Sequence, residues 1–502
     1  MIPKNIQFGG GAAETVVNPV VLAVVLLAGL LIIFLPRKKA IVPLLLAGML
    51  IPINQILMIV GLHFPMMRAL AVFGIARMAW AKISGTDKIF SGGMSGIDWA
   101  LIILAVFSTI DGALLWQSQG EIIFQLGNLY TAFGLYFFLR YLIRDEEDVS
   151  RALRAMAWVV AIIAPCMLYE HITGNNLFYG VLGGLHSAKL EHSVARDGFF
   201  RAQGPFEHPI LAGTFGGFLM PLFVGWWLKK KAERKWAALG VVAATLMAFL
   251  AGSSTALFGL LAGAGALCLW PMRRNMRLVR WGVVGTLIAG QLYMTAPVWH
   301  IISDVSLTAD SSSYHRYALV NECIIHFWDW ALIGTKTYAS WGWDMWDLGN
   351  QYVATADTVG LIPLLALLAM LVYGFKYVGR MRKKVETDKR EELFIWALGA
   401  SLFANMVAFF GISYFDQTII GWYTLLAIIA AVTVGVRVRQ EPQPAMVRLG
   451  VAPVAKLQYG PLRAPPNAVS EVRGRQNESR RTGYTELVWS RVRGTFAEEK
   501  NR

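Results

Sequence analysis

Residues 196–235 read RDGFFRAQGPFEHPILAGTFGGFLMPLFVGWWLKKKAERK and indicate the class of protein. A polar block is followed by an apolar run over 209–228 and then by a basic run. About 20 apolar residues form a helix long enough to cross the roughly 30 Å hydrocarbon core of a membrane, and basic residues collect at its cytoplasmic end. Polar groups beside hydrocarbon are unfavourable, so they usually have a function. We therefore expect a membrane helix with a functional site at its outer end.

The same pattern recurs along the chain. Of its 502 residues, 56% are hydrophobic and 16% are charged, which does not suit a surface exposed only to water. The apolar stretches lack the alternation of strands, so we expect an all-α polytopic membrane protein with about 12–13 transmembrane helices. The predicted spans are 17–35, 40–62, 66–81, 98–115, 122–143, 151–171, 209–228, 236–252, 253–270, 279–297, 356–378, 392–411 and 418–436.

Basic residues predict the orientation of these spans. Arg37–Lys39, Lys229–Lys235, Arg273–Arg277 and Arg380–Arg390 fall in alternate connections, as cytoplasmic loops do. The odd number of spans then places the N-terminus outside the cytoplasm and the C-terminus inside it.

Two connections are long enough to hold a site, and both are expected on the periplasmic side. They are rich in aromatic residues, so we expect them to fold against the membrane and to contain short amphipathic helices. The predicted regions are N-terminal helices 1–171, a first large loop 172–208, central helices 209–297, a second large loop 298–355, C-terminal helices 356–436 and a tail 437–502.

The tail 437–502 differs in composition from the rest of the chain. Its prolines, scattered arginines and weak apolar periodicity predict a mostly disordered cytoplasmic extension. The net charge of +14 is explained by basic cytoplasmic loops and by attraction to anionic lipids. We therefore expect membrane lipids as partners and no nucleic acid.

The first loop offers four candidate residues. Arg196 and Arg201 suit a diphosphate, because a guanidinium fork matches phosphate oxygens; the alternative is contact with lipid headgroups. Glu207 and His208 follow a stiff turn containing Gly204 and are candidates for a catalytic base. The alternative for His208 is a structural role.

The second loop combines aromatic and polar candidates. Trp341 and Trp343 have flat faces that stack on sugar rings or lie in the membrane interface. Arg316 precedes a stretch with apolar residues at helical spacing, which predicts an amphipathic helix whose arginine is directed at the loop core. The other polar candidates are the possible catalytic residues Asp344 and Asp347, the possible glycan contacts Asn350 and Gln351, and Asp357.

The three cysteines give no indication of metal or redox chemistry. Cys166, Cys268 and Cys323 have spacings that suit neither a metal site nor a disulfide framework. We expect no metal and no cofactor.

Four features together resemble the O-antigen ligase and O-antigen polymerase superfamily. They are RAQGPFEHPILAG before a span, the stretch led by Arg316, a segment containing Gly334, and GNQYVATADTVG before another span. The likeness covers residues 195–380 in motif detail and the whole chain in helix pattern. It implies metal-independent transfer of a glycan from undecaprenyl diphosphate at the periplasmic face of the bacterial inner membrane. It also implies that Arg201 and Arg316 hold the diphosphate leaving group.

One position departs from the ligases of this superfamily. Their catalytic histidine corresponds to Gly349, so the proposed base is missing. Either a neighbour acts as the base, or the chain is a polymerase that joins lipid-linked repeat units into surface polysaccharide or exopolysaccharide. We favour the polymerase, with the ligase as the alternative. The candidates for a replacement base are Asp347, Asp344, Glu207 and His208.

The resemblance implies a lipid-linked oligosaccharide donor and a glycan acceptor, with a chain-length regulator or other export proteins as further candidates. A transporter or flippase for such glycans is a rival from another class, and a non-catalytic scaffold is a third. Transporters carry ionisable residues near the membrane midplane. Here Asp111, Glu170 and Asp416 lie near predicted span ends, where we expect interfacial polarity instead.

Overall fold

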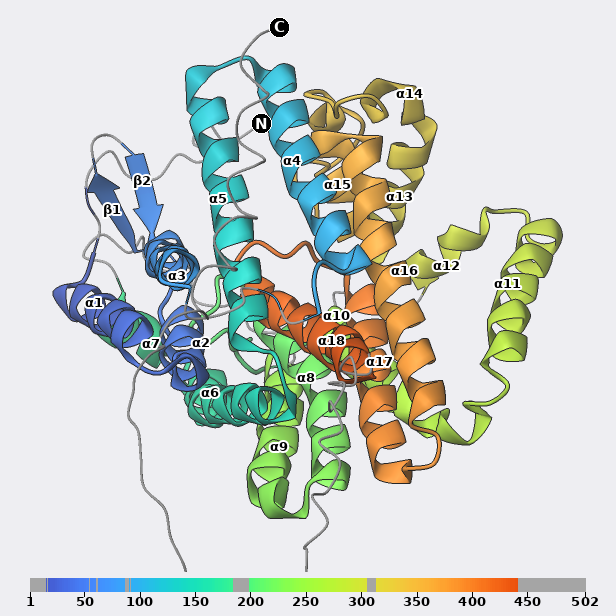
Figure 1. Cartoon of the computed structure of the whole chain (residues 1–502). Coiled ribbons are helices and arrows are strands. Elements are labelled where there is room, and N and C mark those ends of the chain that lie inside the picture. Colours follow the sequence, from blue (N-terminus) through green and yellow to red (C-terminus); the bar gives the residue numbers. More distant parts are fainter. Residues whose placement is uncertain are drawn as a thin grey trace, which may run out of the picture. The chain divides into compact units, whose positions relative to one another are not determined.

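The computed structural model describes residues 15, 17–53, 55–59, 62–85, 90, 92–183, 198–304 and 313–440. Within these ranges the chain is helical apart from one short hairpin (Figure 1). Its contacts divide it into Met1–Pro442 and Gln443–Arg502. Because the described residues end at 440, nearly all of the predicted tail 437–502 lies outside them.

The elements follow one another in a simple order. The longer helices are α1 (Pro19–Phe34), α2 (Ile41–Leu50), α3 (Met66–Ile83), α4 (Gly96–Trp116), α5 (Gln119–Leu142), α6 (Glu146–Thr173), α8 (Pro209–Lys229), α9 (Arg234–Leu250), α10 (Ser254–Cys268), α11 (Met276–Tyr293), α16 (Leu361–Lys384), α17 (Lys389–Ala408) and α18 (Thr418–Gln440). The connections contain α7 (Leu177–Leu182), α12 (Ile301–Asp304), α13 (Ser313–Ile325), α14 (Phe327–Trp330) and α15 (Gln351–Val359).

Six of the described helices are long and apolar enough to cross a membrane, namely α4, α5, α6, α8, α16 and α17. Helices α1 and α10 are apolar but shorter, as is α18 from Thr418 to Thr433. The prediction of an all-α, multi-pass membrane protein is thus confirmed. The larger number of spans stays a prediction.

The predicted span 40–62 is wrong. Helix α2 ends at Leu50, and Ile51 is extended with φ −88° and ψ 124°, because a proline disfavours the helical conformation of the residue before it. After Pro52, strands β1 (Ile56–Ile59) and β2 (Leu62–Pro65) pair in antiparallel register. Both strands are apolar apart from His63, and hydropathy alone does not distinguish an apolar hairpin from the end of an apolar helix.

Helix α8 is the most enclosed of the six. Its apolar segment is 83% buried, against 22% for α4. A Cβ on Gly216 would lie 2.3 Å from the carbonyl oxygen of Ala244 in α9, and one on Gly225 would lie 2.3 Å from Cβ of Ala397 in α17. Small residues that allow such close approach join helices in a membrane, where lipid is as apolar as the side chains. The position of α8 is therefore fixed by its neighbours.

The predicted cytoplasmic connections meet at one end of the helices. Glu392 is fully buried and pairs with both Arg273, at 3.1 Å, and Arg382, at 2.8 Å. Basic runs that are far apart in the sequence therefore share one end, which we call the basic end; the side of the membrane that it faces stays a prediction. Further ion pairs here are Arg37–Asp148, Arg154–Glu233, Arg274–Glu386, Lys229–Glu146 and Lys229–Glu391.

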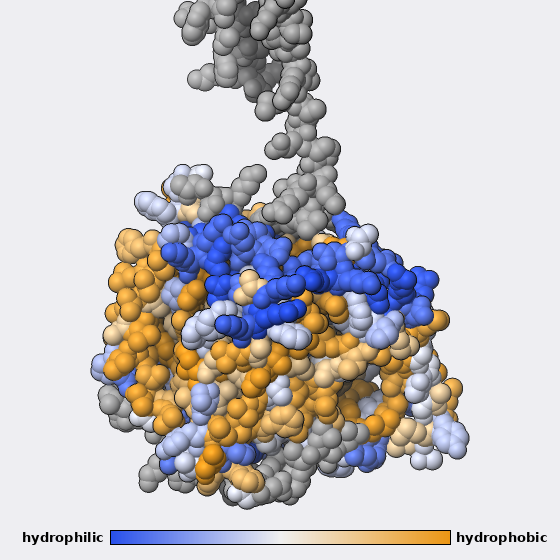
Figure 2. All heavy atoms as spheres, turned by 90° about the horizontal axis from the view of Figure 1, so that it is seen from below, coloured by the Kyte–Doolittle hydropathy of each residue, from blue (hydrophilic) through white to orange (hydrophobic). Residues whose placement is uncertain are grey.

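Much of the surface is hydrophobic. Figure 2 shows hydrophilic residues gathered in a band, with hydrophobic residues around it. Helix α11 is the extreme case, because none of its residues is buried and Leu292 is 83% exposed. It stands apart at the right of Figure 1. Apolar surface of this extent indicates contact with lipid.

The other end of the helices carries both long connections, each of which contains short helices as predicted. The predicted span 356–378 begins too early, because α15 is a separate helix that ends at Val359. Gly360 divides it from α16 with φ 87°, and a Cβ there would lie 2.9 Å from the carbonyl oxygen of Leu332. Only glycine fits such a break.

Candidate functional site

A cavity of about 400 Å³ is lined by residues of both long connections and by residues of two short turns, near 253–254 and 411–415. Its walls come from residues as far apart as 201 and 415. Four of the predicted site residues line it: Arg201, His208, Arg316 and Asp347. The fold thus brings together candidates from both loops.

Arg201 reaches the cavity because the turn between α9 and α10 holds it. The backbone N–H of Ala202 donates to the carbonyl of Leu250 at 3.0 Å, and Nε of Arg201 donates to the carbonyl of Ala251 at 3.3 Å. Gly252 has φ 54°, and a Cβ there would lie 3.1 Å from Cγ of Arg201. A side chain at this position would be strained and would press on the arginine.

Three buried side chains hold the segment that follows Arg201. Glu170 accepts from the N–H of Gly204 at 2.8 Å, and Asp416 accepts from the N–H of Glu207 at 3.1 Å. Gln417 donates to the carbonyl of Pro205 at 2.8 Å. Glu170 and Asp416 lie near helix ends, as expected, but they are 3% and 0% exposed and are therefore buried. They satisfy N–H groups of a loop that lies outside helices and strands.

Arg316 lies in the first turns of α13, the helix that its apolar spacing predicted. Its Nε donates to the carbonyl of Gly411, in the turn between α17 and α18, at 3.4 Å. A Cβ on Gly411 would lie 2.3 Å from Oγ1 of Thr255, so the turn packs tightly on the start of α10. Both arginines are therefore oriented through Nε by carbonyls of turns between membrane helices.

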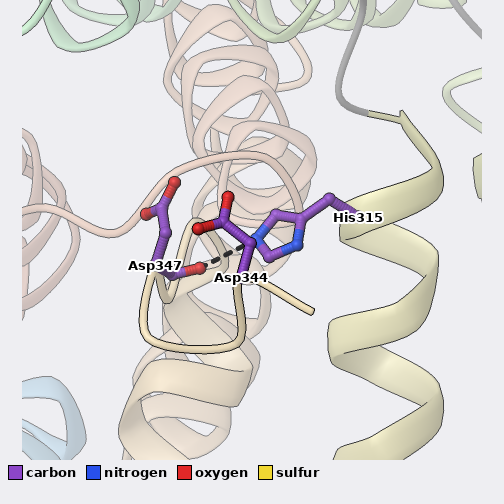
Figure 3. A group of neighbouring side chains, drawn as sticks. All are labelled: His315, Asp344 and Asp347. Atoms are coloured by element: carbon purple, nitrogen blue, oxygen red, sulfur yellow. Dashed lines mark hydrogen bonds between the residues drawn. The ribbon is translucent and has the colours of Figure 1, made fainter. Parts of the chain in front are cut away.

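His315, Asp344 and Asp347 form a compact group beside these arginines (Figure 3). One possible ligand atom from each lies within 4.8 Å of the others. Nε2 of His315 is 3.0 Å from the carbonyl oxygen of Asp347, and a carbonyl can only accept, so Nε2 carries the proton. His315 thereby holds the turn that carries Asp347.

Asp347 lines the cavity and is exposed to solvent, and charged groups of His315, Arg316 and Asp344 lie near its carboxylate. Partial burial raises the pKa of Asp347, His315 and Arg316 lower it, and the like charge of Asp344 raises it. A carboxylate with a raised pKa is a better proton acceptor near neutral pH than an ordinary one. Asp347 is therefore the strongest base candidate in the cavity.

The same three residues are the group of described residues whose spacing suits a metal ion. The tautomer of His315 does not exclude this use, because Nε2 donates to a carbonyl while Nδ1, which has no hydrogen-bond partner, keeps its lone pair. The expectation of no metal stays a prediction.

Three helices begin at the cavity. Ile210 is near the start of α8, Ser254 begins α10, and Arg316 is in the first turns of α13, and all three residues line the cavity. A helix N-terminus carries about half a positive charge, so it favours an anion. Together with two arginines, the helix ends make this a site for an anionic group.

His208 is the N-cap of α8. Its Nδ1 accepts from the backbone N–H of Ile210 at 3.2 Å. The side chain thus satisfies one of the N–H groups that the first helical turn leaves unpaired. The ring is held in a defined orientation at the cavity wall.

Several predicted site residues do not line the cavity. Glu207 points elsewhere, close to Tyr179, and burial raises its pKa. Trp341 stacks on His326 with ring centres 4.4 Å apart, and Trp343 is 83% exposed. The catalytic role of Glu207 and the glycan contacts of Trp341 and Trp343 stay predictions that the cavity lining does not support.

Asn350 and Gln351 are also not at the cavity. Asn350 is fully buried and caps α15 by accepting from the N–H of Tyr352 at 3.0 Å, while its amide donates to the carbonyl of Phe410. Gln351 accepts from the N–H of Tyr414 at 2.7 Å. Both residues hold the 409–414 turn, and their role as glycan contacts stays a prediction.

Two further predicted residues have other outcomes. Arg196 lies outside the described residues. Asp357 is 2% exposed on α15, and burial raises its pKa to about 7, with a hydrogen bond from Cys323 opposing that rise.

Sequence reasoning missed His315, Ser253 and Phe415 as cavity residues. His315 precedes Arg316 directly, and this adjacency was the only available signal. Ser253 is the first residue of the predicted span 253–270, and Phe415 lies in the short connection before the predicted span 418–436; no motif marks either residue.

Comparison with known proteins adds no family. No protein-family model matches the chain, and no curated protein matches it. The resemblance to the O-antigen superfamily therefore rests on the motifs described above.

Proposed function

We propose that this chain is a membrane glycosyltransferase that joins lipid-linked oligosaccharide repeat units into surface polysaccharide or exopolysaccharide. It would act at the periplasmic face of the bacterial inner membrane on glycans carried by undecaprenyl diphosphate. The observation that supports this best is the meeting of Arg201 and Arg316, from two separate loops, at one cavity beside Asp347.

The charges of the cavity suit the diphosphate of such a donor. Two arginines and three helix N-termini would bind the phosphate oxygens, whose negative charge grows as the glycosidic bond breaks. The apolar residues Ile412 and Phe415 line the same cavity, beside the phosphate-binding groups. They suit the first isoprene units of the lipid, while the remainder of the chain would lie in the membrane.

The reaction follows from this arrangement. The hydroxyl oxygen of the acceptor sugar attacks C1 of the donor sugar, and the bond from C1 to the diphosphate oxygen breaks with its electron pair on the leaving group. The carboxylate of Asp347 accepts the hydroxyl proton. A single displacement of this kind inverts the configuration at C1.

The ligase alternative uses the same donor and the same cavity, and differs only in the acceptor, the lipid A core. The transporter alternative needs an ionisable path through the membrane. Among the described residues, Asp98 and Arg140 are fully buried but pair with each other at 3.0 Å. A paired charge of this kind favours a structural role over transport.

Complementation tests the proposal. The gene is deleted in its host, and surface polysaccharide is compared on gels after restoring wild type, Arg201→Ala, Arg316→Ala or the control Arg274→Ala at equal membrane expression. Arg274 is exposed and pairs with Glu386 at the basic end, so its loss should leave long chains intact.

We expect single repeat units after deletion and no long chains with either cavity variant. Full-length polymer that is not attached to lipid A core would indicate the ligase instead. Wild-type behaviour of both cavity variants would show that the arginines only anchor the protein in the membrane.

A further inference from the structure

The position of the proton on the His208 ring determines whether this residue can act as a hydrogen-bond donor or as a base. A neutral imidazole carries one proton, so one ring nitrogen donates and the other accepts. Nδ1 of His208 accepts from the N–H of Ile210 at 3.2 Å. A backbone amide can only donate in this contact, so Nδ1 has no proton and the proton of the neutral ring is on Nε2.

The surroundings oppose a second proton on this ring. Protonated Nδ1 would set two donors against each other at the start of α8. While Nδ1 accepts this hydrogen bond, Nε2–H is the distal group of the ring, and a nitrogen that already carries a proton cannot take one from a substrate.

We propose that His208 donates a hydrogen bond from Nε2–H to the leaving diphosphate and is not the base of the reaction. This inference rests on the proposed function and gives each residue of the cavity a role in the reaction. His208 and the two arginines stabilise the leaving group, and Asp347, on the opposite loop, receives the proton of the acceptor hydroxyl. No proton leaves His208, because a diphosphate is a stable anion that departs without protonation.

The assignment explains why a histidine precedes Pro209. Asparagine or serine would cap the helix equally well, but neither extends a second polar atom beyond the capping atom as far as the imidazole does. Nδ1 therefore has two effects. It caps α8, and because it accepts the N–H of Ile210, it leaves the ring proton on Nε2. Pro209 has no N–H, so the cap is directed to Ile210.

Two substitutions separate the possible roles. In His208→Asn the amide oxygen replaces Nδ1 and keeps the cap, but no atom reaches the place of Nε2. In His208→Gln the terminal amide nitrogen replaces Nε2 and can donate, but it cannot accept a proton. Each variant is purified in lipid nanodiscs, and transfer is measured with a polyprenyl-diphosphate-linked oligosaccharide as donor and acceptor.

We expect His208→Gln to keep activity within about tenfold of wild type, and His208→Asn to lose roughly 10²–10³-fold, as for removal of one donor to a developing charge. Equal, large losses in both would make His208 a base, because neither amide accepts a proton. Full activity of His208→Asn with a loss in His208→Gln would show that His208 serves only as the helix cap. Full activity of both would remove His208 from the reaction.

A binding measurement distinguishes failure of this inference from failure of the proposed function. Stabilisation by inorganic pyrophosphate is measured by thermal shift for wild type and both variants. If wild type transfers no glycan, the proposed function fails, while weaker pyrophosphate binding by His208→Asn than by His208→Gln still supports the donor. Equal binding by both variants overturns the donor in either case.

Discussion

The two ends of the helices hold their arginines in different ways. At the basic end, Arg273 and Arg382 bond to the carboxylate of Glu392, which neutralises part of their charge. At the cavity, Nε of Arg201 and Nε of Arg316 donate to backbone carbonyls, which orient a guanidinium without carrying a net charge. The first arrangement stabilises contacts between helices. The second holds each guanidinium group at the cavity, where the proposed diphosphate would bind.

The largest effect is expected where a buried ion pair loses one partner. Glu392→Ala leaves two largely buried arginines without their carboxylate, which should destabilise the protein by about 3–5 kcal/mol. Thermal unfolding in detergent measures this loss. Activity per folded molecule should remain, because the cavity is at the other end. Glu386→Ala, which removes an exposed partner, is the matched control and should change stability by about 0–1 kcal/mol.

At the cavity we expect the loss of an arginine to lower the transfer rate strongly and the stability little. Arg316→Ala should lower the transfer rate roughly 10²–10³-fold with little change in unfolding temperature, because its charge acts on the leaving group. Arg316→Lys should restore only part of the rate, since lysine keeps the charge without the planar fork. A large fall in unfolding temperature for Arg316→Ala would mean that both ends use arginine structurally.

The pH dependence of the rate probes Asp347. As a base it must be ionised, so activity should fall as pH falls through its raised pKa, and the acid limb should lie above the ordinary value of about 4. Below that limb the rate should drop about tenfold per pH unit. Asp347→Asn should be slow and should lack the limb. An unchanged limb in this variant would assign the base elsewhere.

The smallest effect is expected from metal removal. Excess chelator should leave the transfer rate of purified protein unchanged within error, because the proposed transfer is metal-independent and uses Asp347 as a base. Loss of activity that Mg²⁺ or Mn²⁺ restores would make His315, Asp344 and Asp347 a metal site and would change the interpretation of Asp347 as the base.

The sequence predicts much of the fold because membrane helices leave strong signals. Apolar length and basic loops identify the helices and bring the basic runs to one end. The span over 40–62 could not be resolved in this way, because an apolar hairpin and an apolar helix have the same hydropathy. The break at Gly360 was also hidden, since it depends on the carbonyl of Leu332, which only the folded chain brings close.

The candidate site was predictable where charge and motif coincide, as at Arg201 and Arg316. It was not predictable where a polar side chain serves the backbone. Asn350 and Gln351 look like sugar contacts in the sequence, yet they cap α15 and hold a turn. Asp416 looked like interfacial polarity, yet its carboxylate holds the loop after Arg201. Residue type alone does not reveal whether a partner is a substrate or a main-chain amide.

The bonds from Asp416 and Gln417 have a consequence for synthesis. Both residues directly precede α18, the last described helix, while the loop that they hold, near residues 205–207, is made much earlier. Chains are synthesised from the N-terminus, so this loop enters the membrane interface before its buried partners exist. The arginine before this loop is thus made early, but the hydrogen bonds that fix the loop can form only after Asp416 and Gln417 have been made. Under the proposed function, a ribosome-bound chain that lacks these two residues would be inactive.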